Sequence, residues 1–146
     1  MHMLLLQYLV SAARDPAKFV LPLVARRARA GFPSPADDYV EDGLDLNQLM
    51  VQHKAATFFV RVRGYSMEQA GIRDGDLLVV DRALKPRSGQ IVVAAIDGEL
   101  VVKRLVRRRG QVILEAASPD YGPIEIHDGQ TLDIWGVVTG VVRRMV

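Results

Sequence analysis

The chain has 146 residues and a mass of 16.2 kDa, with 49% hydrophobic and 25% charged residues, so it has the size and composition of one globular domain and is not a disordered chain. Nineteen Lys and Arg against seventeen Asp and Glu give a net charge of +2, which by itself indicates neither nucleic acid nor an anionic membrane as a partner. The lack of cysteine excludes disulfides, thiolate metal sites and cysteine nucleophiles. His2, His53 and His127 lie too far apart in sequence for usual zinc-ligand spacing, so we expect no metal and no cofactor.

The N-terminal segment raises the question of a membrane or an export signal. Residues 3–10 are nearly all apolar, but a membrane-spanning helix needs roughly 20 such residues. Residues 28–30, Ala-Arg-Ala, have the small-x-small form of a leader peptidase site. However, no Lys or Arg precedes the apolar stretch, and Arg26 and Arg27 crowd the supposed cut. We therefore expect a cytoplasmic protein without a membrane span.

A change in charge divides the chain after residue 30. Residues 1–30 carry a net charge of +4, and residues 31–146 carry −2. The boundary is followed by Gly31-Phe32-Pro33-Ser34-Pro35, in which prolines at alternate positions favour an extended connector. The sequence therefore predicts an N-terminal arm over residues 1–30, an extended linker over 31–54 and a β-rich domain over 55–146.

From residue 57 onward, short β-branched runs alternate with turn residues, which is typical of β-structure. The Asp97-Gly98 pair predicts a two-residue hairpin turn. About seven strands are expected, and they lie at Phe58–Val62, Leu77–Val80, Ile91–Ile96, Glu99–Val106, Gln111–Glu115, around Ile124 and at Thr131–Val142. This spacing predicts a mostly β fold with a small, highly curved or closed sheet and only short helices.

The segment after the first of these strands contains Ser66, which has two interpretations. Ser66 can be a helix N-cap, with Gln69 completing a capping box and Gly71 ending the helix. A serine at a bend before a helix is also well placed to act as a nucleophile. The backbone N–H groups of Ser66 and Met67 can then stabilise an oxyanion. The two interpretations are compatible, and the residues alone do not decide between them.

A serine nucleophile needs a base, and Lys103 is the candidate. Strand alternation places Lys103 on one face of its strand together with Val101 and Leu105, and Arg104 on the other. Burial disfavours the ammonium form and lowers the pKa of a lysine, so that a neutral amine can accept the serine proton near neutral pH. The alternative is an ordinary lysine at a sheet edge, with its stem packed and its ammonium in water.

With these residues in hand, the chain resembles the LexA and UmuD family of self-cleaving serine peptidases. The resemblance covers roughly residues 31–146. The stretches that carry it are Gly31–Ala36, Tyr39–Glu41, Leu44–Leu49, the Gly-x-Ser-Met centred on Ser66, Gly71-Ile72-x-Asp74-Gly75-Asp76, Asp97-Gly98-Glu99 and Val102-Lys103. It implies that Ser66 is the nucleophile, that Lys103 is the general base and that the chain cuts its own Ala30–Gly31 bond.

The resemblance also implies a biological setting. In this family a RecA filament on single-stranded DNA stimulates self-cleavage during the SOS response to DNA damage. The shortened form, as a homodimer, then joins an error-prone Y-family DNA polymerase of the UmuC type in translesion synthesis. The first 30 residues are too few for a helix-turn-helix domain, which favours an UmuD-like accessory protein over a LexA-like repressor. Two departures from the relatives are Tyr65, in place of a smaller or acidic residue, and the sequence of the arm.

Three other functions make different predictions. A non-catalytic β-rich binding module, in which Ser66 only caps and Lys103 only packs, predicts a stable full-length chain. DNA binding through Arg107–Arg109 or Arg143-Arg144 is not expected, because no stacking aromatic residues interleave with these arginines; a basic turn and a solvated terminus are the favoured interpretations. A signal peptidase shares the serine and lysine chemistry but needs a membrane anchor.

Overall fold

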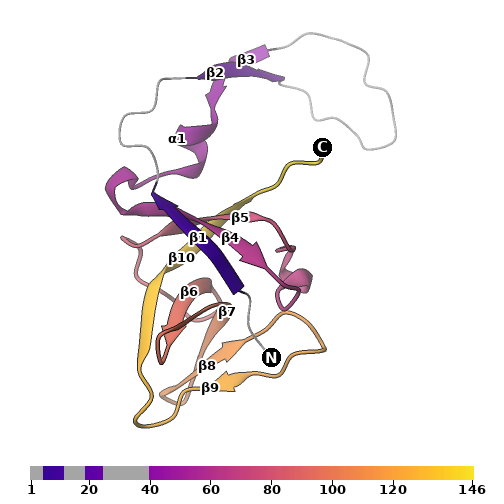
Figure 1. Cartoon of the computed structure of the whole chain (residues 1–146). Coiled ribbons are helices and arrows are strands. Elements are labelled where there is room, and N and C mark those ends of the chain that lie inside the picture. Colours follow the sequence, from indigo (N-terminus) through magenta and orange to yellow (C-terminus); the bar gives the residue numbers. More distant parts are fainter. Residues whose placement is uncertain (1–4, 12–18, 25–39) are drawn as a thin grey trace.

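The computed structural model describes residues 5–11, 19–24 and 40–146, and antiparallel strands are its dominant elements (Figure 1). Eight strands form one sheet in the order β1-β4-β5-β10-β6-β7-β8-β9. Their bounds are Leu5–Ser11 (β1), Thr57–Arg63 (β4), Leu77–Asp81 (β5), Ile91–Ile96 (β6), Glu99–Arg108 (β7), Gln111–Glu115 (β8), Ile124–Glu125 (β9) and Leu132–Val142 (β10). The predicted mostly β fold class is confirmed.

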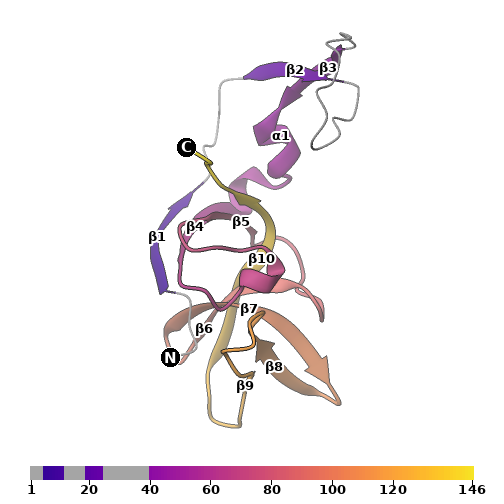
Figure 2. The ribbon, with the colours of Figure 1, turned by 90° about the vertical axis from the view of Figure 1, so that its right-hand side faces the viewer.

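The sheet curves strongly, so that strands distant in its order approach each other. The end strand β1 contacts β7 although four strands separate them in the order. Figures 1 and 2 show β1 and β4 on one side of the curve and β8 and β9 on another. A fully closed sheet is not confirmed, because the order of the described strands has two ends, β1 and β9.

The curvature gives the sheet two buried layers of side chains. In β4 the burial alternates, with Phe58, Val60 and Val62 buried and the residues between them partly exposed. In β6 and β7, by contrast, consecutive residues are buried, as at Val101 and Val102, because both faces of these strands are covered. Apolar side chains fill both clusters, and β7 passes between them. A residue in the middle of β7 is therefore shielded from water whichever face it occupies.

The seven strands predicted between residues 57 and 142 are all present, as β4 to β10. Asp97 and Gly98 connect β6 to β7 with positive φ angles of 49° and 84°, as the two central residues of a type I′ turn require. Strand β10 pairs with β6 in its first half and with β5 in its second half, and its register with β6 shifts between Ile134 and Gly136. A Cβ atom at Gly136 would lie 2.9 Å from the carbonyl oxygen of Asp81, so this close approach requires glycine.

The described residues before 55 contain regular structure that the sequence analysis did not predict. Besides β1, they form β2 (Val20–Val24) and β3 (Val40–Asp45), which pair as a separate two-stranded sheet, and helix α1 (Leu46–Met50). Pro22 lies within β2, although proline lacks the N–H that a central strand needs. A two-stranded sheet has only edge positions, which tolerate it. In both ribbon views the β2–β3 pair lies beyond α1, away from the large sheet (Figures 1 and 2).

The helices of the described residues are short. Asp45 starts α1 by accepting a hydrogen bond from the backbone N–H of Asn47 at 2.9 Å. The other two are the 3₁₀ helices η1 (Lys54–Ala56) and η2 (Glu68–Ala70). Within the described segments, no helix has the length and apolar character that crossing a membrane requires.

Candidate active site

Ser66 lies in the loop that connects β4 to β5, which we call the serine loop (residues 64–76). The loop begins at Gly64, whose φ angle of 98° turns the chain out of the strand. The backbone N–H of Gly64 donates to Asp74 Oδ1 at 2.8 Å, which ties the start of the loop to its far side. The carbonyl oxygen of Ser66 accepts a hydrogen bond from the N–H of Ala117 at 2.8 Å. The backbone around Ser66 is therefore fixed from two directions.

The predicted N-cap role of Ser66 is wrong. Helix η2 begins at Glu68, its N-cap position is Met67, and no side chain caps it, so the capping box with Gln69 does not form. The reason is that the helix starts one residue later than the pattern indicates. The predicted end is confirmed, since Gly71 has a φ angle of 82° and donates its N–H to the carbonyl of Glu68 at 2.9 Å.

Lys103 reaches Ser66 from the middle of β7. Its Nζ atom lies 2.9 Å from Ser66 Oγ and donates a hydrogen bond to it. Lys103 has no exposed surface, and Ser66 is 1% exposed. The structure thus brings together the two residues that the sequence analysis selected, and it places both out of contact with bulk water.

Burial lowers the pKa of Lys103 from 10.5 to about 8, because removal from water disfavours the ammonium form. A shift of this size corresponds to about 3 kcal/mol of unfavourable free energy for the charged lysine. The ring of Tyr121 lies nearby, with its centroid 5.8 Å from Nζ, and the face of an aromatic ring attracts an ammonium group. A substantial fraction of Lys103 is therefore neutral in mildly alkaline solution.

The backbone around Ser66 offers hydrogen-bond donors. In the described part of the chain, the N–H groups of Ser66 and Met67 donate to no acceptor. Met67 itself is fully buried in the core, which holds this turn in place. Two adjacent N–H groups without acceptors, next to a serine hydroxyl, are suited to receive a carbonyl oxygen as it gains negative charge.

A clamp from the end of β10 braces the serine loop. Arg143 donates from Nε to Asp76 Oδ1 and from Nη2 to Asp76 Oδ2, both at 2.6 Å, and Nη2 also lies 2.9 Å from the carbonyl oxygen of Gly71. Asp76 also accepts the backbone N–H of Arg73 at 2.7 Å. Burial acts to raise the pKa of Asp76, but the hydrogen bonds from Arg143 and Arg73 outweigh it, and the pKa is lowered. Residues 143–146 are exposed, as expected of a solvated terminus, but the ion pair of Arg143 with Asp76 was not predicted.

Other candidate residues lie outside this arrangement. The predicted cleavage site, Ala30–Gly31, is not among the described residues. His53 Nδ1 lies 2.6 Å from Asp81 Oδ2 and is engaged there. No group of three or more His, Asp or Glu side chains suited to hold a metal ion occurs in the described segments. Arg109 occupies the turn between β7 and β8, as expected of a basic hairpin turn.

The supporting residues of the site were not predicted from the sequence. Asp74, Asp76 and Arg143 hold the serine loop, and Tyr121 faces Lys103. The Gly71-Ile72-x-Asp74-Gly75-Asp76 motif was part of the resemblance, but its spacing does not say that both carboxylates fold back onto the loop. Tyr65, noted as a departure from the relatives, precedes Ser66 in the chain and is 57% exposed.

Comparison with known proteins gives consistent results. The model of the S24-like peptidase family matches residues 22–139. Protein ImpA of Salmonella typhimurium is 50% identical over 134 residues, covering 89% of this chain and 90% of ImpA. Protein MucA of Escherichia coli is 45% identical over 82% of each chain. The LexA repressor of Paracidovorax citrulli is 39% identical over 88% of this chain but only 56% of the repressor.

Proposed function

The chain belongs to the S24 peptidase family, as an UmuD-like member of its LexA and UmuD group, and we propose that it is a self-cleaving serine peptidase with Ser66 as nucleophile and Lys103 as general base. The observation that carries the proposal is the buried hydrogen bond of 2.9 Å between Lys103 Nζ and Ser66 Oγ. A lysine whose pKa is lowered to about 8 by burial supplies the neutral amine that the chemistry needs.

The first half of the reaction forms an acyl-enzyme. Neutral Lys103 accepts the proton of Ser66 Oγ, and the oxygen attacks the carbonyl carbon of Ala30. The carbonyl oxygen becomes an oxyanion, which the N–H groups of Ser66 and Met67 stabilise. Protonated Lys103 then donates its proton to the nitrogen of Gly31, the Ala30–Gly31 bond breaks, and Ala30 remains as an ester on Ser66.

The second half releases the ester. Lys103 has given its proton to Gly31 and is neutral again, so it can take a proton from a water molecule, whose oxygen attacks the ester carbonyl. The proton then returns to Ser66 Oγ, and residues 1–30 leave with a free carboxylate. The reaction gains from intramolecularity, because a segment docked in the right geometry reacts as if present at on the order of 10⁵–10⁸ M. The rate therefore depends on how often residues 28–33 dock at Ser66.

The biological role follows from the family resemblance. In this proposal a RecA filament on single-stranded DNA favours the docked state, so that cleavage answers DNA damage in the cytoplasm. Removal of residues 1–30 takes away a charge of +4 and leaves residues 31–146 with −2. This change of sign alters the surfaces that the protein attracts. The shortened form then acts, as a homodimer, as the accessory subunit of a Y-family polymerase in translesion synthesis.

The experiment is to follow the intact mass of the purified full-length protein over time at pH 9, with and without a RecA filament. We expect a fragment that begins at Gly31, and we expect it to be absent in Ser66→Ala and in Lys103→Ala. Ser88→Ala and Lys85→Ala change exposed residues of the same types and are expected to cleave like the parent. Cleavage that persists in Ser66→Ala would exclude the serine mechanism, and a parent chain that stays intact under every condition would favour a non-catalytic binding module.

A further inference from the structure

Strand β1 occupies the outer edge of β4, at one end of the large sheet. The two strands are antiparallel. Their pairing runs from Leu5 opposite Arg63 to Ser11 opposite Phe58, and the register is irregular between Leu6 and Leu9. Figures 1 and 2 both show β1 lying alongside β4. On its other side β4 pairs with β5. The edge of β4 therefore accepts an extended strand, and in the uncut chain the strand is supplied by the chain's own N-terminal segment.

The proposed cut removes the covalent connection of β1 to the domain. Ala30 and Gly31 lie between Val24, the last residue of β2, and Val40, the first residue of β3. Both β1 and β2 consequently belong to the N-terminal fragment. After the cut, only non-covalent contacts hold β1 to β4 and β7, and β2 to β3.

Loss of the tether changes the occupancy of the β4 edge. A segment that is covalently tethered to its binding site is present there at an effective concentration of about 1 mM. Once free, the fragment is present only at the concentration of the protein, about 1 µM in a dilute solution. We therefore expect the ratio of bound to unbound β1 at the β4 edge to fall roughly a thousandfold after the cut.

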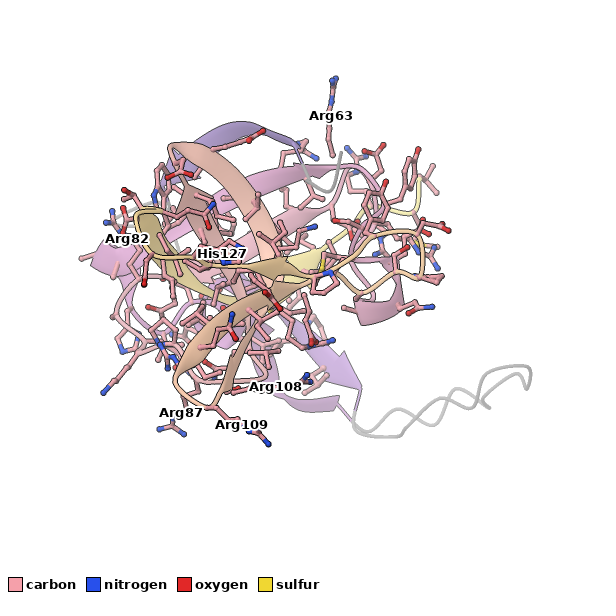
Figure 3. The ribbon with its side chains drawn as sticks, turned by 90° about the horizontal axis from the view of Figure 1, so that it is seen from below. Arg63, Arg82, Arg87, Arg108, Arg109 and His127 are labelled. Atoms are coloured by element: carbon pink, nitrogen blue, oxygen red, sulfur yellow. The ribbon has the colours of Figure 1, made fainter. Side chains whose placement is uncertain are left out.

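The edge that β1 leaves is suited to another strand. It is seven residues long and contains no proline, which would lack the N–H that strand pairing needs. Its core-facing residues, Val60 and Val62, are fully buried beneath it. On the opposite face, Arg61 is partly exposed and Arg63 is exposed, and Figure 3 shows Arg63 pointing away from the ribbon. An exposed edge of this kind tends to pair with another chain.

We propose that cleavage exposes the β4 edge as a docking surface for an extended segment of a partner protein, which adds as an antiparallel strand in the place of β1. The partner segment carries apolar residues on the face toward the core and at least one carboxylate on the face of Arg61 and Arg63. Main-chain hydrogen bonds supply the affinity, and the alternate side chains supply the specificity. The inference rests on the proposed function only for the cut itself.

The test separates strand release from self-cleavage. A recognition site for a sequence-specific protease is inserted between residues 25 and 39 of the full chain carrying Ser66→Ala, and the chain is then nicked by that protease. We expect hydrogen exchange at the backbone amides of residues 58–63 that face β1 to accelerate about a hundredfold or more after nicking. The un-nicked chain, and amides of β6 in the same sample, serve as controls.

Docking is measured on the nicked chain with fluorescent peptides of residues 3–13. We expect millimolar peptide to restore slow exchange in β4. The same peptide carrying Gln7→Glu should bind severalfold more tightly. This gain in affinity should disappear when Arg61 of the protein is changed to Glu. A peptide carrying Val10→Pro is expected not to bind. Unchanged exchange in β4 after nicking, with residues 1–30 co-eluting, overturns release of the strand. Rapid exchange without peptide binding overturns docking. Slow exchange at residues 58–63 that returns when the concentration of the nicked protein is raised without peptide shows that a second copy, and not a partner segment, covers the edge.

Discussion

Lys103 Nζ lies 2.9 Å from Ser66 Oγ although 37 residues separate them in the sequence. The contact arises because β7 passes between the two buried clusters and the serine loop, which follows β4, brings Ser66 to Lys103 in the middle of that strand. The same burial that joins the two side chains also lowers the pKa of the lysine to about 8. Position and proton affinity therefore have one structural cause, and they can be tested separately.

The first prediction concerns the stability of the fold. In a Ser66→Ala background, we expect Lys103→Met to raise the free energy of unfolding at pH 7 by up to about 3 kcal/mol, because it removes a buried ammonium group. The pKa of Lys103 is about 8 in the folded state and 10.5 when unfolded, so between these values the unfolded chain binds more protons and the lysine form gains stability as the pH rises. The advantage of Met should therefore shrink from pH 8 to 10.5 in urea unfolding. A difference that does not change with pH, as expected for Lys85→Met, would show that folding does not lower the pKa of Lys103.

The second prediction concerns Tyr121. If its ring stabilises the ammonium form of Lys103, then Tyr121→Leu removes that stabilisation and lowers the pKa further. We expect the midpoint of the pH–rate profile of self-cleavage to move down by about half a pH unit. Tyr121→Phe keeps the ring and should keep the midpoint of the parent. Equal shifts in the two variants would assign the effect to the hydroxyl group.

The third prediction concerns the clamp from β10. Arg143→Ala frees Asp76 and Gly71, and misplacement of reacting groups by 1 Å can cost about a hundredfold in rate. We expect self-cleavage to slow ten- to a hundredfold with an unchanged pH midpoint, because Lys103 is held by β7. Arg144→Ala, at the next and exposed position, should cleave like the parent, and Arg143→Lys should recover part of the rate. Equal rates for the two alanine variants would mean that the clamp does not position the serine loop.

The same ion pair predicts an acid-dependent loss of stability. The pKa of Asp76 is lowered in the fold from its ordinary 3.8, so its contribution is present above that value and is lost as the pH falls through the lowered pKa. The parent should therefore be more stable than Arg143→Ala at pH 6, and the difference should narrow below pH 4. Thermal unfolding of the two proteins across this range measures it, and a constant difference would rule out the ion pair as its source.

The sequence predicted the strands from residue 57 onward well because their signals are local. Alternation in Phe58–Val62 and the Asp97-Gly98 turn depend only on neighbouring residues, and both are present in the structure. The earlier strands depend on partners that local patterns do not show. Strand β1 pairs with β4, and β2 pairs with β3 across a gap of fifteen residues that contains the predicted cut.

The sequence predicted the two candidate catalytic residues, Ser66 and Lys103, but not the residues that hold them in place. Alternation alone left Lys103 between a buried base and a sheet-edge lysine, and only the coverage of both faces of β7 places it fully out of water. The hydrogen bonds from Gly64 to Asp74 and from Arg143 to Asp76 join positions up to 67 residues apart. Such contacts depend on the path of the loop, which short-range spacing does not encode.

The pH dependence of fragment formation tests the central claim most directly. The rate at which the full-length chain yields a fragment beginning at Gly31 is measured by mass spectrometry from pH 6 to pH 10. We expect the rate to rise about tenfold per pH unit below pH 7, to reach half its maximum near pH 8 and to level off above pH 9, following the neutral fraction of Lys103. A profile that is flat over this range would contradict Lys103 as the base.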